Sequence, residues 1–185
     1  MLRFLVRYTS FLLIILLFCT TITAQDTIPD FPASWQGEWY GDLVISNGGG
    51  EVQRLPMILR ILPTEDKRYT FTIIYGEDTP ENTRPYFLQS VNADQGHYET
   101  DEANGIFLDD FLINEKLYSR FEVMGTLLLT TIEERDGQLI YEIIAGPLEP
   151  LRTTGDTIVE GEEIPPVNGY RINVQQRAVL SKKKE

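Results

Sequence analysis

Cysteine is nearly absent from this chain of 185 residues, which has only Cys19. That residue lies in an apolar N-terminal segment, so the rest of the chain has no thiol for a disulfide bond or a cysteine-based metal site. Without that segment, roughly 160 residues remain, enough for one domain. The stability of such a domain depends on the burial of a core.

Positive charge is also scarce, because 16 Lys and Arg residues stand against 28 Asp and Glu residues and give a net charge of −12. A negative field of this size disfavours nucleic acid and anionic lipid surfaces as partners. The basic run at 182–184 is too short to reverse it and is typical of a solvated tail. The sequence therefore predicts no nucleic-acid partner.

A continuous hydrophobic run occurs at the N-terminus, where residues 1–24 have the layout of a secretory signal peptide. Two arginines precede the apolar stretch 11–18, and small and polar residues lead to Ala24. The stretch is short for a membrane span, so we expect cleavage after Ala24 and no stable membrane span in the cleaved protein. We therefore expect a periplasmic or extracellular protein. An uncleaved signal anchor is the alternative. Phe18 replaces the small residue that a lipoprotein signal has before its cysteine, and export without disulfide bonds fits a bacterial envelope.

Alternation of apolar and polar side chains dominates the remaining chain, and residues 69–75 show it most clearly. Their aromatic and aliphatic side chains fall on one face and two threonines on the other, as in a strand with one buried face. No segment after residue 24 has a convincing amphipathic helical pattern. Strands are expected at about 39–45, 52–62, 69–75, 85–92, 97–102, 106–113, 117–123, 127–133, 138–145 and 170–180.

Turn signals separate these strands. Asn104-Gly105 and Asp136-Gly137 favour tight hairpins, because both positions tolerate left-handed backbone geometry. Pro56 lacks an N–H, so it predicts a bulge or an unpaired stretch in the second strand. Residues 146–169 carry several prolines, glycines and acids, and we expect a long loop there that acts as a lid or cover.

Consecutive hairpins must hide the edges of their sheet, and closure of the sheet on itself removes both edges. The expected fold is therefore all-β, an antiparallel up-and-down barrel of about eight to ten strands. The barrel domain is expected over residues 35–182, after an N-terminal lead-in segment at 25–34.

The segment Gly37-Glu38-Trp39 resembles the Gly-x-Trp motif at the start of the first strand in lipocalins. With the strand order, it makes the chain similar to the lipocalin and fatty-acid-binding (calycin) superfamily. In that superfamily the tryptophan closes one end of the barrel, and a basic residue near the last strand packs over it. The resemblance implies these roles for Trp39 and Arg177, with Arg171 as the alternative. It implies a binding barrel but no particular ligand.

Aromatic side chains and polar groups on apolar faces are the candidate ligand contacts. Aromatic rings stack on a ligand or fill the core, and core filling is the more common role. A buried polar group needs a hydrogen-bond partner, which a ligand or a water molecule can provide. On these grounds the candidate ligand-binding residues are Tyr69, Tyr75, Gln89, Tyr98, Ser119 and Gln176.

His97 is the only histidine, and Glu99 and Asp101 fall on its side of the expected strand. This group is the main candidate for catalysis, although a single imidazole near a turn is more often a surface group. Acidic runs such as 101–104 and 109–110 offer oxygen ligands for calcium, but they lack the spacing of a known loop. Solvated charge is the better interpretation, so we expect no catalytic residue, metal or cofactor.

Three functions fit these patterns. The first is an exported binding barrel that holds a small apolar or amphipathic ligand without catalysis. The second is a solid barrel whose acidic surface or 146–169 loop engages another protein of the cell envelope. The third is a hydrolase or isomerase that uses His97 with nearby acids. We favour the binding barrel, because alternation indicates one inward face along almost the whole chain.

Overall fold

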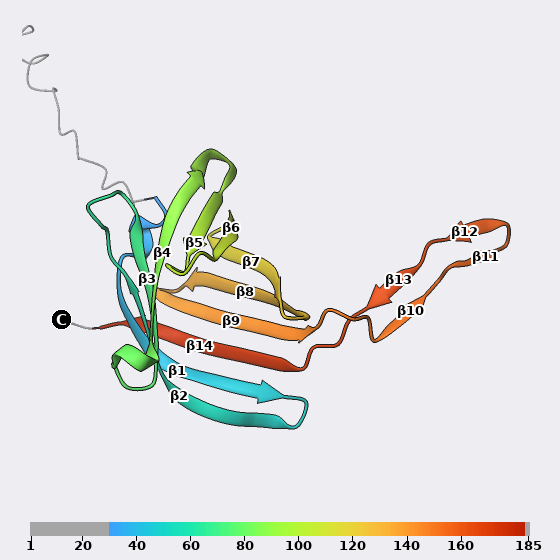
Figure 1. Ribbon diagram of the computed structural model, residues 1–185, viewed down its shortest axis with the longest axis horizontal. Helices are drawn as coiled ribbons and strands as arrows, with labels where there is room; N and C mark the ends of the chain where they lie inside the picture. Colours follow the sequence, from blue (N-terminus) through green and yellow to red (C-terminus); the bar gives the residue numbers. More distant parts are fainter. Residues whose placement is uncertain (1–29, 184–185) are drawn as a thin grey trace, which may run out of the picture.

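A computed structural model describes residues 30–183 of the chain (Figure 1). The predicted signal peptide, residues 1–24, and residues 25–29 of the predicted lead-in segment lie outside the described residues. The described chain forms a closed barrel of ten strands and a narrow two-stranded arm that extends from it.

The barrel strands follow one another in up-and-down order, and each is antiparallel to its neighbours. This confirms the predicted all-β antiparallel barrel, which is consistent with a calycin-like architecture. Pairing of β1 with β14 closes the sheet and removes its edges. The strands are β1 (Gly37–Asn47), β2 (Gly50–Ile61), β3 (Tyr69–Tyr75), β4 (Thr83–Asn92), β5 (His97–Asp101), β6 (Phe107–Ile113), β7 (Lys116–Val123), β8 (Thr126–Arg135), β9 (Gln138–Pro147) and β14 (Val174–Lys182).

The core lies inside the barrel and consists of the alternate side chains of these strands. In β3, Phe71 and Ile73 are buried in the core, and Tyr69 and Tyr75 pack against it, as the alternation predicts. Pro56 marks the end of a ladder, because β2 pairs with β3 from Met57 onward and has only β1 beside it before that point.

Successive turns of an up-and-down barrel lie alternately at its two ends. We call the closed end the one that holds the turns 114–115 and 136–137 and the N-terminal segment 30–36. The open end holds the turns 102–106 and 124–125 and the base of the arm. Asp136 and Gly137 have φ values of 54° and 75°, as the predicted hairpin requires.

Two tryptophans fill the closed end. Trp35 ends the short 3₁₀-helix η2 (Ala33–Trp35), and its carbonyl accepts a hydrogen bond of 2.8 Å from Nε1 of Trp39. Trp39 is only 2% exposed. The ammonium group of Lys182 lies 4.8 Å from the centre of the Trp39 ring, so a cation covers this tryptophan.

That cation is not one of the arginines that the lipocalin resemblance implied. Arg177 is exposed on the outer face of β14, where it pairs with Val44 and Glu142. Side chains alternate along a strand, so Arg177 points away from the interior while Lys182 shares the inward phase of Leu180. Arg171 lies before β14 begins and is also exposed.

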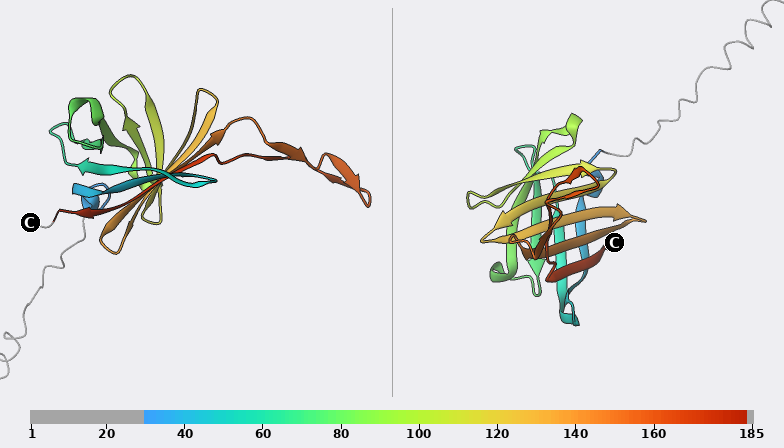
Figure 2. Two further views of the ribbon diagram at one scale, coloured as in Figure 1. Left: turned by 90° about the horizontal axis from the view of Figure 1, so that it is seen from below. Right: turned by 90° about the vertical axis from the view of Figure 1, so that its right-hand side faces the viewer.

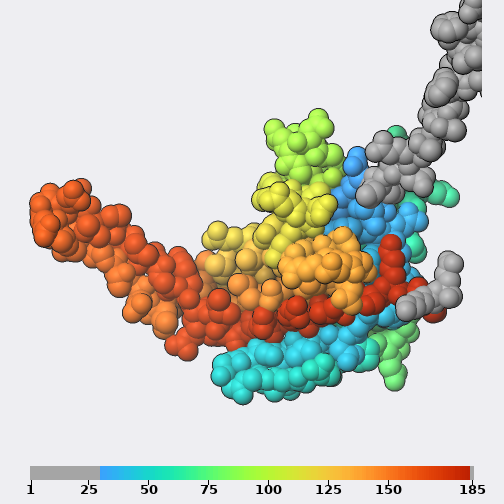
Figure 3. Space-filling view, turned by 180° about the vertical axis from the view of Figure 1, so that it is seen from behind, coloured from blue at the N-terminus to red at the C-terminus, as the bar shows by residue number. Residues whose placement is uncertain are grey.

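The segment expected as a covering loop forms the arm, a ribbon that extends away from the barrel (Figures 1 and 2). Near the barrel, β10 (Arg152–Thr154) pairs with β13 (Val167–Gly169), and further out β11 (Thr157–Val159) pairs with β12 (Glu162–Ile164). Every residue from 151 to 168 is exposed. The space-filling view shows this ribbon standing clear of the barrel (Figure 3).

The last barrel strand starts four residues later than the alternation predicts. Tyr170 and Ile172, expected on its inward face, are exposed in the segment that leads from the arm into β14. A Cβ atom at Gly146 would lie 1.8 Å from the carbonyl oxygen of Arg171. The two segments therefore cross closely where the arm leaves the barrel, and only glycine fits at that crossing.

Helical structure in residues 30–183 consists of short 3₁₀ turns, which besides η2 are η3 (Pro80–Asn82) and η4 (Ala93–Gln95). No helix in this described range is long and apolar enough to cross a membrane.

Candidate functional site

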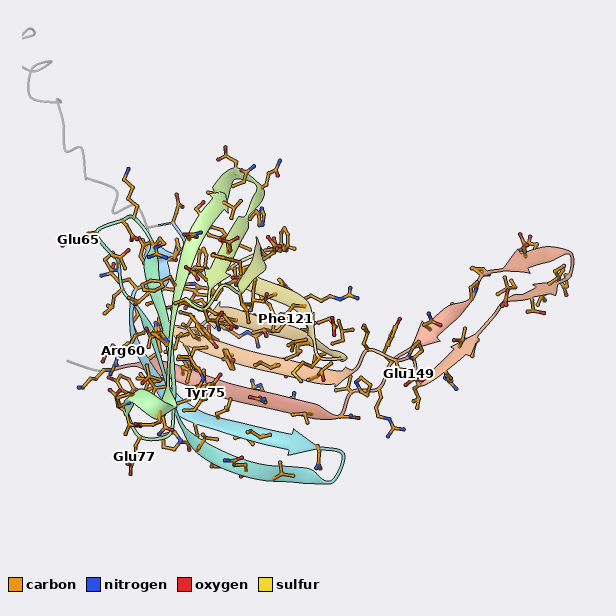
Figure 4. The ribbon with its side chains drawn as sticks, viewed as in Figure 1. Arg60, Glu65, Tyr75, Glu77, Phe121 and Glu149 are labelled. Carbon is orange, nitrogen blue, oxygen red and sulfur yellow. The ribbon has the colours of Figure 1, made fainter. Side chains whose placement is uncertain are left out.

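A cavity of about 160 Å³ lies in the barrel interior between the core of the closed end and the open end. Its walls come from the consecutive strands β3 to β9, and none of its lining residues belongs to β1, β2 or β14. Figure 4 labels two of the lining side chains, Tyr75 at the end of β3 and Phe121 on β7. The aromatic lining residues are Phe71, Tyr75, Tyr86, Phe121 and Tyr141.

Two tyrosines meet across the cavity. The hydroxyl oxygens of Tyr75 and Tyr141 are 3.2 Å apart and share a hydrogen bond. Burial raises the pKa of both phenols, because a phenolate is poorly solvated inside the barrel. Both hydroxyl groups are therefore protonated at neutral pH and can serve as hydrogen-bond donors and acceptors.

A carboxyl group also faces the cavity. Asp110, on β6, is only 3% exposed, and its carboxylate accepts a hydrogen bond of 2.6 Å from the Thr100 hydroxyl. Burial raises the pKa of Asp110 to about 6, against the opposing effect of the hydrogen bond from Thr100. Ser119 Oγ donates its proton to the backbone carbonyl of Asp109 at 3.0 Å. A buried acid with a perturbed pKa in a cavity is a candidate functional group.

The structure places two of the six candidate ligand-binding residues, Tyr75 and Ser119, in the cavity wall. Tyr69 is half-buried and packs against the core, but it does not line the cavity. Gln176 has the inward phase of β14 and is half-buried beyond the cavity, in register with Ile45 and Ile143.

Tyr98 and Gln89 have other roles. Tyr98 is buried at the closed end, where its ring meets that of Phe31 edge to face and its hydroxyl donates to the Phe31 carbonyl at 3.3 Å. Gln89 follows the buried Leu88, so its side chain points outward and donates a hydrogen bond of 2.7 Å to Glu99.

His97 lies on the outer face of β5 and does not line the cavity. Its Nε2 is 2.7 Å from a carboxylate oxygen of Asp109, and its ring stacks on Phe111 with centroids 4.9 Å apart. Neither Glu99 nor Asp101, expected beside the histidine, is its partner: Glu99 binds Gln89, and Asp101 forms an ion pair with Arg68. The histidine and the acids of the enzyme hypothesis therefore lie outside the interior cavity.

The acidic runs do not converge on a cation site. Within residues 30–183, no group of three or more histidine, cysteine, aspartate or glutamate side chains is arranged to hold a metal ion. Asp109 and Asp110, neighbours in sequence, point to opposite faces of β6. The run at 160–163 lies near the tip of the exposed arm.

Other hollows lie outside the barrel interior. One of about 640 Å³ borders Trp35, Leu112 and Asp30, where the described chain begins. Another of about 240 Å³ lies on the outer face of β8 and β9 under Tyr170. The interior cavity brings several polar groups together among apolar and aromatic side chains, which is the usual character of a ligand site.

Cavity size limits what can bind. Pockets for drug-sized ligands begin at roughly 300 Å³, whereas an apolar cavity of about 150 Å³ holds one benzene ring. At about 160 Å³, this cavity accepts a single ring or a short chain, or the end of a longer molecule that reaches out through the open end. A whole lipid does not fit inside.

The sequence interpretation missed Asp110 as a site residue, because β6 carries apolar residues on both faces. Phe107 and Phe111 are largely exposed on the outer face, while Leu108 and Asp110 line the cavity. One signal pointed to Asp110: it shares its phase with Leu108 and Leu112, so it is a polar group between two apolar ones.

The chain was compared with family models, with curated proteins and with solved structures, and no match was found in any of the three. The assignment of function therefore rests on the barrel and on its cavity.

Proposed function

We propose that the protein is an exported binding protein that holds a small apolar or amphipathic molecule in its barrel and does not catalyse a reaction. The observation that carries this proposal is the interior cavity, in which five aromatic side chains surround a few polar groups. Its aromatic faces and aliphatic side chains favour an apolar body, and its hydroxyl groups favour a polar end. Export rests on the signal-like segment 1–24.

Native mass spectrometry of the protein purified from its own host tests this proposal directly. A co-purified small molecule of constant mass is the expected result. Thr130 lines the cavity, so Thr130→Phe should fill the space and remove that mass. Thr157→Phe makes the same change on the exposed arm and should leave the mass in place. A Thr130→Phe protein that is folded and still carries the molecule would contradict a site in the cavity.

The arm favours a second candidate function, interaction with another protein of the cell envelope. Leu151, Ile158 and Val167 are each more than half exposed along a narrow ribbon. An isolated two-stranded ribbon is marginally stable in water, and its edges present unpaired backbone groups to other chains. A protein partner would cover both features.

Replacement of residues 150–170 by an Asn-Gly turn tests this second function. Cross-linking in the host followed by mass spectrometry should identify a defined envelope protein attached to arm residues of the intact chain. The shortened protein should lose that cross-link and keep its small molecule. If the same partner attaches to both proteins, the arm is not the interaction site.

A further inference from the structure

The charged groups of the cavity have one sign. Two carboxyl groups line it: Asp110, which is nearly fully buried, and Glu102, which is half-buried just past the end of β5. None of the cavity-lining side chains in the described chain is a lysine, arginine or histidine. A ligand carboxylate or phosphate would therefore meet like charge without a compensating cation, which disfavours anionic ligands.

Asp110 has capacity for a further hydrogen-bond donor. A carboxylate offers about four lone-pair positions, and the Thr100 hydroxyl occupies one of them at 2.6 Å. The Ser119 hydroxyl donates its proton to the Asp109 carbonyl at 3.0 Å and does not occupy a second position. A charged N–H donor in the cavity would form a short, charge-assisted hydrogen bond with this carboxylate.

The aromatic walls favour the same kind of ligand. The face of an aromatic ring carries negative quadrupole charge and attracts ammonium groups within about 6 Å. Five rings line a cavity that has room for about one ring of the ligand. A cation with a small apolar body would thus find a carboxylate, aromatic rings and an apolar space within one site.

On the basis of the binding function proposed above, we propose that the ligand is a small organic amine, whose ammonium group binds Asp110 and whose apolar body packs against the aromatic walls of the cavity. Glu102 adds negative charge at the half-exposed side of the site and attracts the cation toward it.

Calorimetric titration at pH 7.5 with benzylammonium, toluene and benzoate tests this proposal, because the three probes share one ring and differ in charge. We expect benzylammonium to bind about tenfold or more tightly than toluene, and benzoate to bind more weakly than either. Equal affinity for benzylammonium and toluene would overturn the amine proposal but leave the binding barrel intact. Failure of all three probes to bind would overturn both.

Two neighbouring aspartates supply a matched pair of variants. Asp110→Asn should reduce benzylammonium affinity about tenfold or more and leave toluene affinity unchanged. Asp109→Asn removes the same charge from the outer face of the same strand, where the side chain is 68% exposed, and should change neither affinity. Circular dichroism verifies that both variants fold. Equal losses in both variants would show that only the net charge matters, and they would contradict direct contact with Asp110.

Glu102→Gln provides a second variant that does not alter the buried acid. It should weaken benzylammonium binding about two- to fivefold, because a half-exposed charge acts through a more polar medium. If benzylammonium affinity is unchanged in both Glu102→Gln and Asp110→Asn, the proposal is overturned. The Glu102→Gln result holds whatever the stability of Asp110→Asn.

The amine should also bind less tightly in acid. Protonation of Asp110 removes its charge, so benzylammonium affinity should fall below about pH 6 while toluene affinity stays level. A level benzylammonium profile between pH 5 and 7.5 would contradict an ion pair with this acid. Several other titratable or charged groups surround Asp110. Those that line the same cavity are Tyr75, Tyr86, Glu102 and Tyr141. Asp109 and His97 act on Asp110 through their charge.

Discussion

The closed end of the barrel buries large apolar side chains, whereas the region toward the open end buries a carboxyl group beside unfilled space. At the closed end, the rings of Trp35 and Tyr98 meet that of Phe31 edge to face. Trp39 Nε1 and the Tyr98 hydroxyl donate hydrogen bonds to backbone carbonyls. Toward the open end, Asp110 sits among aromatic rings. Burial of apolar surface stabilises a fold, while burial of an ionisable group lowers its stability.

The two ends of the barrel therefore have different roles: the closed end supplies stability, and the region toward the open end supplies the proposed binding site. Strain and unfilled volume are tolerated where a ligand can relieve them, provided that another region supplies the stability. We expect substitutions at the closed end to affect unfolding most, and substitutions around the cavity to affect binding and its pH dependence.

Trp39→Ala should produce the largest loss. Removal of a fully buried tryptophan leaves a cavity and costs about 3–5 kcal/mol in the free energy of unfolding. Urea denaturation followed by circular dichroism measures the change. Tyr170→Ala removes an aromatic side chain that is 47% exposed near the base of the arm. Because surface substitutions usually change the free energy of unfolding by about 0.5 kcal/mol or less, this variant should lose well under about 1 kcal/mol. Similar losses in the two variants would contradict the special role of the closed end.

Asp110→Asn should have the opposite sign and stabilise the unliganded protein at neutral pH. The pKa of Asp110 is raised from 3.8 to about 6 in the folded state, so ionisation disfavours folding. Its destabilising contribution is absent below about pH 4, grows as the pH rises toward about 6 and is constant above that value. The asparagine variant avoids this contribution and should gain about 2–3 kcal/mol at pH 7.5.

The measurement is the free energy of unfolding of both proteins between pH 4 and 8. The difference between the two free energies should grow through pH 4–6 and then stay level. Taking the difference cancels the contributions of the surface acids that both proteins share. A constant difference for Asp110→Asn would show that its carboxyl group does not titrate with a raised pKa.

Replacement of residues 150–170 by Asn-Gly should alter the free energy of unfolding less than the other changes at the open end. The arm buries almost nothing, since every residue from 151 to 168 is exposed. We expect the free energy of unfolding to change by less than about 1 kcal/mol. Thermal unfolding by calorimetry measures it. A loss comparable to that of Trp39→Ala would mean that the arm is part of the folded unit of the barrel.

Much of the barrel could be predicted from the sequence, because each strand with one buried face leaves a period of two and each hairpin leaves a turn signal. Residues 69–75 and the Asp136-Gly137 turn are examples in which pattern and structure agree. The prediction was wrong where apolar residues do not mark an inward face. Tyr170 and Ile172 continue the alternation of β14 but are exposed, since the chain returning from the arm rejoins the barrel only at Val174.

The site was less predictable, because a cavity is a property of strand register and of the volumes that meet across the barrel. Tyr75 and Tyr141 are 66 positions apart, and no local pattern shows that their hydroxyl groups meet. Gln89 looks like an inward polar group because apolar residues occur on both faces of β4, but the buried Leu88 holds the inward face, so Gln89 points outward and donates to Glu99. Which tyrosines meet depends on pairings between strands, which periodicity within one strand does not determine.

Lys182→Ala should give a small change in stability and tests how the closed end is sealed. The ammonium group lies over the Trp39 ring near the surface, and such an exposed cation–π contact is worth about 0.5–1 kcal/mol. Lys182→Arg should preserve the stability, since a guanidinium group also stacks on an indole face. Arg177→Ala, on the outer face of the same strand, should have less effect than Lys182→Ala. A larger loss for Arg177→Ala would restore the arginine that the lipocalin resemblance implied as the cover of this end.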